Sequence, residues 1–181
     1  MTGVLLGEET VTGSSTYTIS FTSIDQSYDD LMVIGSMASD TTTGFGATNL
    51  YIKPNSESSS MCMAASSRVQ YSPTNTNMTR LLDPFWIFEE MLATAKDSDM
   101  SFSPLYIYLP SYASSTVKLN GTVRGGVLAG TPGAASSGLS TYSFEQVGGI
   151  VYDRTDAITQ LDIYPSHGAI KAGSKLSLYG I

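Results

Sequence analysis

His167 is the only histidine in the chain, and it lies in the tetrapeptide Pro165-Ser-His-Gly168. A Ser-His-Asp triad would therefore have to use His167 as its general base, with Ser166 or a distant serine as the nucleophile. The Gly-x-Ser-x-Gly sequence that holds a nucleophilic serine on a sharp turn is missing. Proline and glycine on either side of the pair indicate a turn, so we interpret His167 as a solvated turn residue without a catalytic role.

Paired carboxylates, which cleave glycosidic bonds in many enzymes, are the second candidate. The pairs are Asp29-Asp30, Glu89-Glu90, and Asp153 with Asp156. Adjacent residues of an extended strand point to opposite faces, so the first two pairs cannot face each other if they lie on strands. The segment Asp153-Arg-Thr-Asp156 has the character of a polar turn with a local ion pair through Arg154. We therefore predict no catalytic residues, and we predict that the protein is not an enzyme.

The chain offers few ligands for a metal or a cofactor. A single cysteine, Cys62, excludes an intrachain disulfide and a cysteine-based metal site, and its two methionine neighbours indicate a small buried hydrophobic residue. Asp97-Ser-Asp99 could bind calcium on a loop, but it does not have the spacing of an EF-hand, and we interpret it as a turn. Gly125-Gly126 and Gly148-Gly149 are not followed by the lysine and helix of a phosphate-binding loop. We predict no metal site and no cofactor.

Aromatic side chains could bind sugars or another protein. Trp86 lies within Phe85-Trp-Ile-Phe88, an apolar run that favours the core or a subunit interface. Tyr71, Tyr112 and Tyr142 are expected to be exposed, where they would serve a sugar-binding platform or a protein interface equally well.

The composition favours strands over helices. Serine and threonine together make up about a quarter of the chain, well above ordinary usage, while charged residues are 14% and tyrosines number 11. Hydroxyl side chains compete with helical backbone hydrogen bonds, and Tyr and Thr suit the pleated surface of a sheet. A net charge of −7 argues against nucleic-acid binding, which requires clustered Lys and Arg. No apolar run approaches the length of a membrane span.

Alternating apolar and polar residues predict a series of short strands. Leu105, Ile107 and Leu109 should lie on one face of a strand, with Tyr106 and Tyr108 on the other. Residues 61–80 are weakly patterned, and residues 81–92 fit either a helix opened by Asp83-Pro84 or a strand. The predicted strands lie within residues 14–21, 31–38, 48–53, 102–109, 116–128, 139–152, 158–163 and 176–178, with loops at 41–46, 54–60 and 130–138.

These segments predict an all-β fold, a jelly-roll-like antiparallel β-sandwich of about eight strands in a single domain. The domain is expected to span residues 14–181. Residues 1–13 have little charge and little periodicity, and we predict that they form an N-terminal arm that reaches onto a neighbouring molecule. The N-terminus has neither the positive start nor the long apolar stretch of a signal peptide, so synthesis in a cytoplasm is expected.

Short segments spread over most of the chain follow a characteristic order. They are Tyr17-Thr-Ile-Ser-Phe21, Ile24-Asp-Gln-Ser-Tyr28, Asp30-Leu-Met-Val-Ile-Gly-Ser36, Asn49-Leu-Tyr-Ile52, the run from Phe102 to Ala113, Ala157-Ile-Thr-Gln-Leu161 and the run from Gly173 to Ile181. This order resembles that of bacteriophage virion proteins, in which such patterns recur in the jelly-roll modules of capsid-decoration, head-fibre and tail-fibre proteins. Lys53-Pro54-Asn55 departs from the Phe-Asn-Gly-type turn that similar modules often carry, although Pro54-Asn55 would still turn there.

The resemblance implies a non-enzymatic structural protein of the virion, made in the host cytoplasm. The expected role is that of a capsid decoration or cement protein that binds the major capsid protein and its own copies, with a homotrimer as the expected oligomer. The alternative is a carbohydrate-binding module for receptor recognition on a tail fibre or spike. An exposed cluster of Trp or Tyr with flanking Asp and Asn would favour that alternative.

Overall fold

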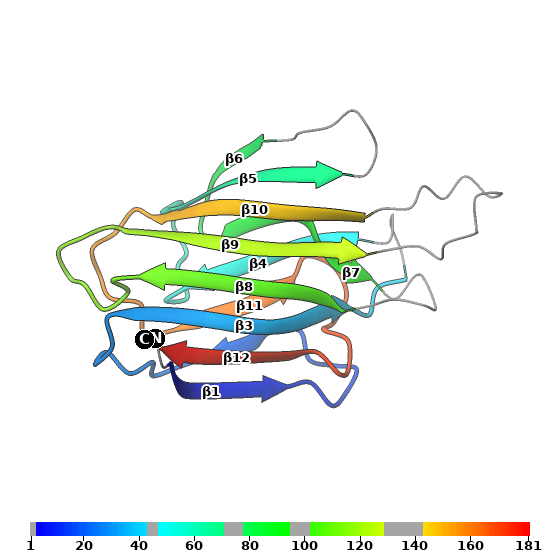
Figure 1. Cartoon of the computed structure of the whole chain (residues 1–181), viewed down its shortest axis with the longest axis horizontal. Helices are drawn as coiled ribbons and strands as arrows, with labels where there is room; N and C mark the ends of the chain where they lie inside the picture. Colours follow the sequence, from blue (N-terminus) through cyan, green and yellow to red (C-terminus); the bar gives the residue numbers. More distant parts are fainter. Residues whose placement is uncertain (1–2, 43–46, 71–77, 95–101, 129–142) are drawn as a thin grey trace.

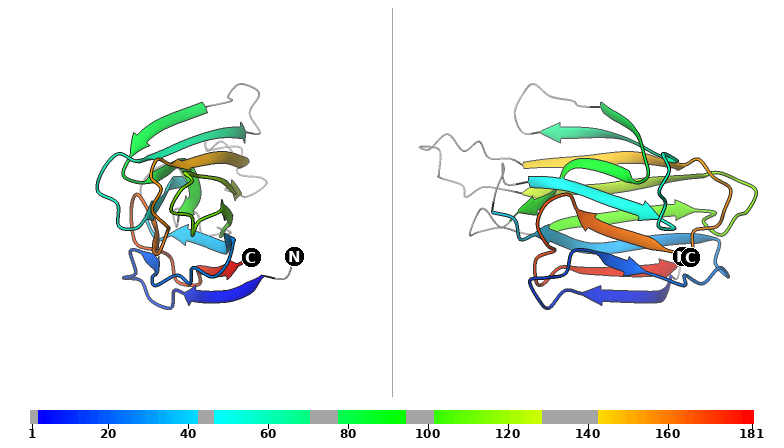
Figure 2. Two further views of the ribbon diagram at one scale, coloured as in Figure 1. Left: turned by 90° about the vertical axis from the view of Figure 1, so that its left-hand side faces the viewer. Right: turned by 180° about the vertical axis from the view of Figure 1, so that it is seen from behind.

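The chain folds into two packed layers of β-strands. The computed structural model describes residues 3–42, 47–70, 78–94, 102–128 and 143–181, and these contain twelve strands and no helix (Figure 1). The wide layer contains, in spatial order, β1 (Val4–Thr10), β12 (Lys175–Gly180), β3 (Asp30–Ser39), β8 (Ser103–Pro110), β9 (Leu119–Leu128), β10 (Ser143–Tyr152), β5 (Cys62–Gln70) and β6 (Met78–Asp83). The narrow layer contains β2 (Ile19–Phe21), β11 (Leu161–Pro165), β4 (Ala47–Pro54) and β7 (Trp86–Thr94), and Figure 2 shows it from behind.

The prediction of an all-β sandwich is confirmed, but the described residues form twelve strands where about eight were expected. One strand pair is parallel: β3 joins β7 through Ala38 with Ala93 and Ser39 with Thr94, so the two layers form one continuous sheet. The weakly patterned residues 61–80 supply β5 and β6. The inward side chains of β5 include Cys62, Ala64 and Ser66, which are buried. Such small residues give a poor hydrophobic signal, which explains why this strand was not predicted.

The strand β8 shows how the sequence pattern produces the layer. Leu105, Ile107 and Leu109 are buried, and the alternate residues Tyr106 and Tyr108 lie on the outer face, as predicted. Side chains alternate between the two faces of a strand, so every second residue of β8 enters the core. Each layer of the sandwich therefore has an apolar inner surface that forms the core and an outer surface that does not contribute to the core.

The ambiguous residues 81–92 form a strand rather than a helix. Trp86 and Phe88 on β7 are fully buried between the layers, whereas Ile87 between them faces outward. The Trp86 indole Nε1–H donates to the Val151 carbonyl at 2.8 Å, and its ring meets that of Tyr152 edge-on at 6.4 Å. Trp86 is therefore a core residue that joins the narrow layer to β10 of the wide layer.

The N-terminal segment is part of the sheet in this structure. We expected residues 1–13 to form an arm outside the sandwich, but Val4–Thr10 form β1, which pairs antiparallel with β12 at the edge of the wide layer. The following Val11 is buried and exchanges backbone hydrogen bonds with Gly173 and Ser174. Val4 and Leu5 on β1 remain 48% and 53% exposed. The segment thus ends the sheet and still presents apolar side chains to the surroundings.

Two adjacent glycines of β10 have opposite surroundings. A Cβ atom on Gly148 would lie 2.5 Å from the Phe88 ring, so the layers approach closely there and only glycine fits. A Cβ atom on Gly149, which faces outward, would meet nothing within 4 Å. The outer surface of β10 is therefore open at Gly149.

Candidate functional site

Ser166 and His167 do contact each other in the turn after β11. The Ser166 Oγ lies 2.9 Å from the His167 Nδ1 and 2.9 Å from the Thr48 Oγ1. The nearby Asp40 carboxylate accepts a hydrogen bond from the Ala169 backbone N–H at 2.7 Å, and the Ser39 hydroxyl donates to the His167 carbonyl at 2.6 Å. In the described part of the chain, these polar groups shape the turn, and no carboxylate is hydrogen-bonded to the imidazole as a triad requires.

The candidate carboxylates are separated and have structural partners. Asp30 accepts hydrogen bonds from the Tyr108 hydroxyl at 2.5 Å and from the Ser111 backbone N–H at 3.0 Å. The hydrogen bond between Tyr108 and Asp30, together with the partial burial of Tyr108, raises the pKa of Tyr108 to about 12. Asp153 pairs with Lys118 at 2.5 Å, while Asp156 accepts a hydrogen bond from the Tyr152 hydroxyl at 3.1 Å.

Of the remaining acidic candidates, the structure describes the side chains of Asp29 and Glu89. Asp29 and Glu89 are exposed. The side chain of Glu90 and the residues Asp97 and Asp99 lie outside what the structure describes. Within the described ranges, no three residues among His, Cys, Asp and Glu gather as metal ligands.

An ion pair between a buried carboxylate and a partly exposed arginine, which sequence reasoning missed, joins two loops. Glu57 is only 8% exposed, and its Oε2 lies 2.7 Å from the Arg154 Nε. Its Oε1 accepts hydrogen bonds from the Ser59 hydroxyl at 2.5 Å and from the backbone N–H groups of Ser58 and Ser59 at 2.9 Å. The hydrogen bond from the Ser59 hydroxyl has the largest effect on the Glu57 carboxylate. Together with the backbone hydrogen bonds and the positive charge of Arg154, it lowers the pKa of Glu57 to about 2.

The Glu57–Arg154 pair corrects the prediction of a local ion pair within residues 153–156. The partner of Arg154 comes from the loop between β4 and β5, which the pair ties to the turn between β10 and β11. Asn55 reinforces this junction, because its Oδ1 accepts hydrogen bonds from the backbone N–H groups of Thr159 and Gln160. The only local signal was that Glu57 precedes a run of three serines, and its carboxylate accepts hydrogen bonds from the backbone N–H groups of the first two. The cluster stabilises the fold.

The structure places several aromatic residues differently from the prediction. Tyr112 was expected to be exposed, but it is buried, and its hydroxyl donates to the Asp25 carbonyl. Tyr71 and Tyr142 lie outside the described residues. Three other rings form a half-buried cluster on the outer face of the narrow layer: Tyr51 lies 4.6 Å from Phe85 and 5.5 Å from Tyr164. The strand pairing places Asp162 and Lys53 in the next row.

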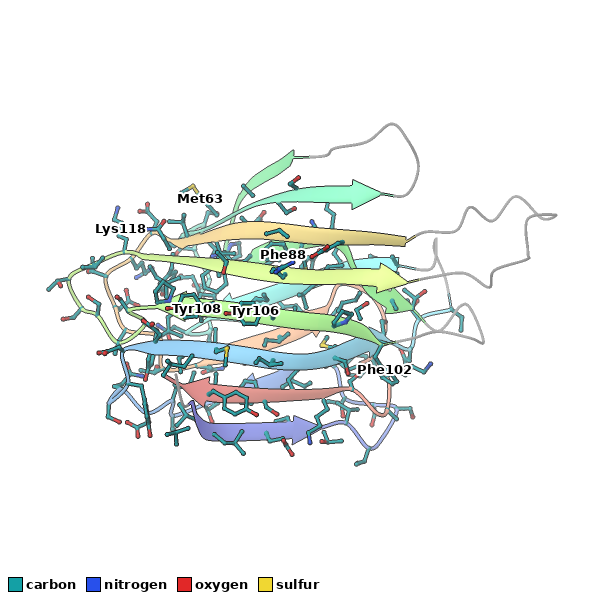
Figure 3. The ribbon with its side chains drawn as sticks, viewed as in Figure 1. Met63, Phe88, Phe102, Tyr106, Tyr108 and Lys118 are labelled. Carbon is teal, nitrogen blue, oxygen red and sulfur yellow. The ribbon has the colours of Figure 1, made fainter. Side chains whose placement is uncertain are left out.

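The outer face of the wide layer carries partly exposed apolar and aromatic side chains. Ile34 on β3 and Val147 on β10 are 41% and 44% exposed, and Tyr106 and Tyr108 lie half-exposed along β8 (Figure 3). On the side of β9 that carries β10 and β5, the outer face has a shallow hollow of about 350 Å³ around Gly149. Its lining consists mainly of small or apolar residues, namely Met63, Ala64, Ala65, Asn120, Gly121, Ile150 and Val151.

Three ion pairs lie on or beside the outer surface of the wide layer. Arg124 contacts Glu145 at 2.6 Å across β9 and β10, Lys175 contacts Glu8 at 2.9 Å, and the Lys118–Asp153 pair lies at the end of β9. We refer to this outer surface of β3, β8, β9, β10 and β5 as the wide face. It presents Ile34 and Val147 beside exposed polar residues such as Thr122 and the Arg124–Glu145 pair.

Cys62 is buried, as predicted from its neighbours, and burial raises the pKa of its thiol to about 12. A thiol held in this protonated state is a poor nucleophile and a poor metal ligand. No helix in the described ranges has the length and hydrophobicity to cross a membrane.

Comparison with known proteins gives no family assignment. No protein-family model matches the chain, and no curated protein matches it significantly.

Proposed function

We propose that this protein is a non-enzymatic structural component of a bacteriophage particle, a capsid decoration or cement protein that binds the major capsid protein. The proposal rests on the resemblance of the sequence segments to phage virion modules. The observation that supports it most is the surface itself: large apolar side chains are exposed on flat strands, while the polar clusters of the described residues serve the fold.

Strand β1 is the part of the surface best suited to the capsid contact. Val4 and Leu5 are about half exposed on the last strand of the wide layer, where a partner can reach them. Burial of such side chains supplies binding free energy without requiring charge. A chain with a net charge of −7 offers no general basic surface for steering. Attachment should therefore weaken only modestly when the salt concentration rises.

The test is binding of the purified protein to phage heads that lack it, measured by co-sedimentation. We expect the double variant Val4→Ser with Leu5→Ser to bind about 5- to 150-fold more weakly, because it removes apolar burial worth roughly 1–3 kcal/mol. Val117→Ser is the matched control, since Val117 is also an exposed valine (58%) but lies in the loop between β8 and β9. Equal binding of the double variant and the wild type would contradict this role for β1, and absence of the protein from heads would contradict the proposal.

The aromatic cluster of the narrow layer supports a second candidate function, recognition of host glycans by a tail fibre or spike. Tyr51, Phe85 and Tyr164 form a continuous aromatic patch. Aromatic rings can pack against the apolar faces of sugars, and the neighbouring Asp162 offers carboxylate oxygens to sugar hydroxyls. The Gln160 amide donates to both of these oxygens at 3.0 Å and so orients the carboxylate.

Titration calorimetry with host surface polysaccharide tests this second function. If the aromatic patch binds glycans, Tyr164→Ala should weaken binding by about tenfold or more, the loss expected for one well-packed aromatic contact. Tyr17→Ala is the control, because Tyr17 is exposed but is not part of the patch. No heat of binding from the wild type, together with its presence on heads, would exclude the glycan function in favour of the capsid function.

A further inference from the structure

We propose that β1 is an exchangeable strand, which leaves its own sheet and pairs with β12 of a second copy of this chain. Two copies that exchange β1 reciprocally form a dimer in which each sheet is completed by the other molecule. The exchange takes place between copies of the free protein, so it does not depend on the capsid role.

Strand β1 is held mainly by its backbone pairing. It lies at the edge of the wide layer (Figure 1), and among the described strands it pairs with β12 alone. Five of its seven residues are exposed, and the other two, Leu6 and Gly7, are half-buried. The neighbouring β12 instead buries Leu176 and Leu178 in the core. An edge strand with so little apolar burial separates at a lower free-energy cost than the core strands do. The rest of the sandwich can therefore stay packed when β1 leaves.

The edge of β12 is specific for the sequence of β1. The Glu8 Oε1 lies 2.9 Å from the Lys175 Nζ, and the Glu8 Oε2 accepts a hydrogen bond from the Ser177 hydroxyl at 3.0 Å. The preceding Gly7 lies against Phe21 on β2, and a Cβ atom at this position would come within 3.2 Å of the Phe21 ring. The edge thus accepts a strand in which a glycine precedes a glutamate. A second copy of this chain supplies that strand, with its charge matched to the lysine.

A hinge between β1 and β2 allows the strand to swing out. Residues 12–15 are all exposed. The chain is fixed on both sides of them: the Val11 N–H donates to the Ser174 carbonyl at 2.9 Å, and the Ile170 N–H donates to the Thr16 carbonyl at 2.7 Å. Rotation is therefore confined to residues 12–15, so that Val11 moves together with β1 while Thr16 stays with the sandwich.

The closed and exchanged forms contain the same contacts. The β1–β12 ladder, the Glu8–Lys175 pair and the packing of Val11 are lost in one copy and made again in the other. The two forms differ only in the hinge and in the cost of bringing two molecules together. A strand on a short tether meets its own β12 at an effective concentration on the order of 1 mM. Exchange is thus expected at protein concentrations of about 1 mM, and the closed monomer is expected in dilute solution.

A disulfide between two different cysteine variants tests the exchange. Leu5 and Tyr179 are opposite each other in the β1–β12 register, and opposite residues of an antiparallel pair lie within reach of a disulfide. Leu5→Cys and Tyr179→Cys are mixed at about 1 mM in a glutathione buffer, and mass spectrometry identifies the linked peptides. Neither variant can form this disulfide within one chain, and Cys62 is buried and should not compete. A peptide that joins β1 to β12 therefore requires exchange.

Val117→Cys replaces Leu5→Cys in the matched control. Val117 is 58% exposed and Leu5 is 53% exposed, but Val117 lies in the loop between β8 and β9. We expect the Leu5→Cys mixture to give at least about tenfold more linked peptide than the control, and we expect its yield to fall on dilution to about 10 μM. Equal yields from the two mixtures at about 1 mM would overturn the inference.

The length of the hinge gives a second test, which the crosslinking does not depend on. Deleting Ser14 and Ser15 shortens the maximum span of the hinge by about 7 Å, so β1 can no longer fold back onto its own β12. Because short hinges favour exchange, this variant should sediment at micromolar concentration with twice the mass of its chain. Inserting Gly-Ser after Ser15 is the control and should leave a monomer. A deletion variant that is monomeric and as stable to urea as the wild type would contradict the exchange of β1.

Discussion

Replacing Trp86 with alanine is expected to lower the free energy of unfolding by about 3–5 kcal/mol, the usual loss for a large aromatic residue in a core. Trp86 is fully buried, and its indole also donates a hydrogen bond to the Val151 carbonyl at 2.8 Å. The substitution therefore leaves a cavity between the layers and removes the indole hydrogen bond to the Val151 carbonyl. Urea unfolding followed by circular dichroism measures the change.

The control for Trp86→Ala is Val117→Ala on the surface loop, which should change the free energy of unfolding by no more than about 0.5 kcal/mol. A loss below about 1 kcal/mol for Trp86→Ala would mean that Trp86 does not join the two layers as described. The comparison is informative because the sequence alone left residues 81–92 open between helix and strand.

The second large effect is expected at Glu57, and it should depend on pH. The pKa of Glu57 is about 2 in the folded protein, below its ordinary value of 4.5. A carboxylate with a lowered folded pKa stabilises the protein above its unfolded pKa, and this contribution disappears as the pH falls through the folded pKa. We therefore expect Glu57→Gln to lower the free energy of unfolding by about 2 kcal/mol at pH 7, the scale of hydrogen bonds to a charged group. The difference from wild type should shrink between about pH 4.5 and pH 2.

Glu145→Gln provides the matched control for Glu57→Gln. Glu145 also pairs with an arginine, Arg124, at 2.6 Å, but both side chains are mostly exposed. Exposed ion pairs contribute about 0–1 kcal/mol, so this variant should remain close to wild type at pH 7. If the two variants lose the same stability, or if the Glu57→Gln deficit is unchanged at pH 2, the junction between the loops is not held by the ionised Glu57.

The local sequence pattern predicted a strand correctly where the side chains of its two faces differ strongly in hydrophobicity. The alternation of Leu105, Ile107 and Leu109 with two tyrosines placed β8 and its faces correctly. Strand β5 was not predicted because its inward residues are small, and β1 was not predicted because most of its residues are exposed. A strand at a sheet edge is stabilised by pairing with its neighbour, and pairing is not a property of its own sequence.

The candidate sites depended more strongly on tertiary structure. Glu57 and Arg154 are 97 residues apart in the chain, and the sequence around each gave no indication of the other. Tyr51, Phe85 and Tyr164 become a cluster only because β4, β7 and β11 are neighbours. Tyr112 looked like an exposed loop tyrosine, but the fold supplies the Asp25 carbonyl that allows its hydroxyl to be buried.

The sequence by itself determined the all-β class, the inward faces of the strongest strands and the buried state of Cys62, because these follow from composition and from a period of two residues. Only the tertiary structure decided which strands are neighbours and in what register they pair. That register brings Tyr108, Thr122 and Gly149 into one row. Register depends on contacts between residues far apart in the chain, so no local pattern could have revealed it.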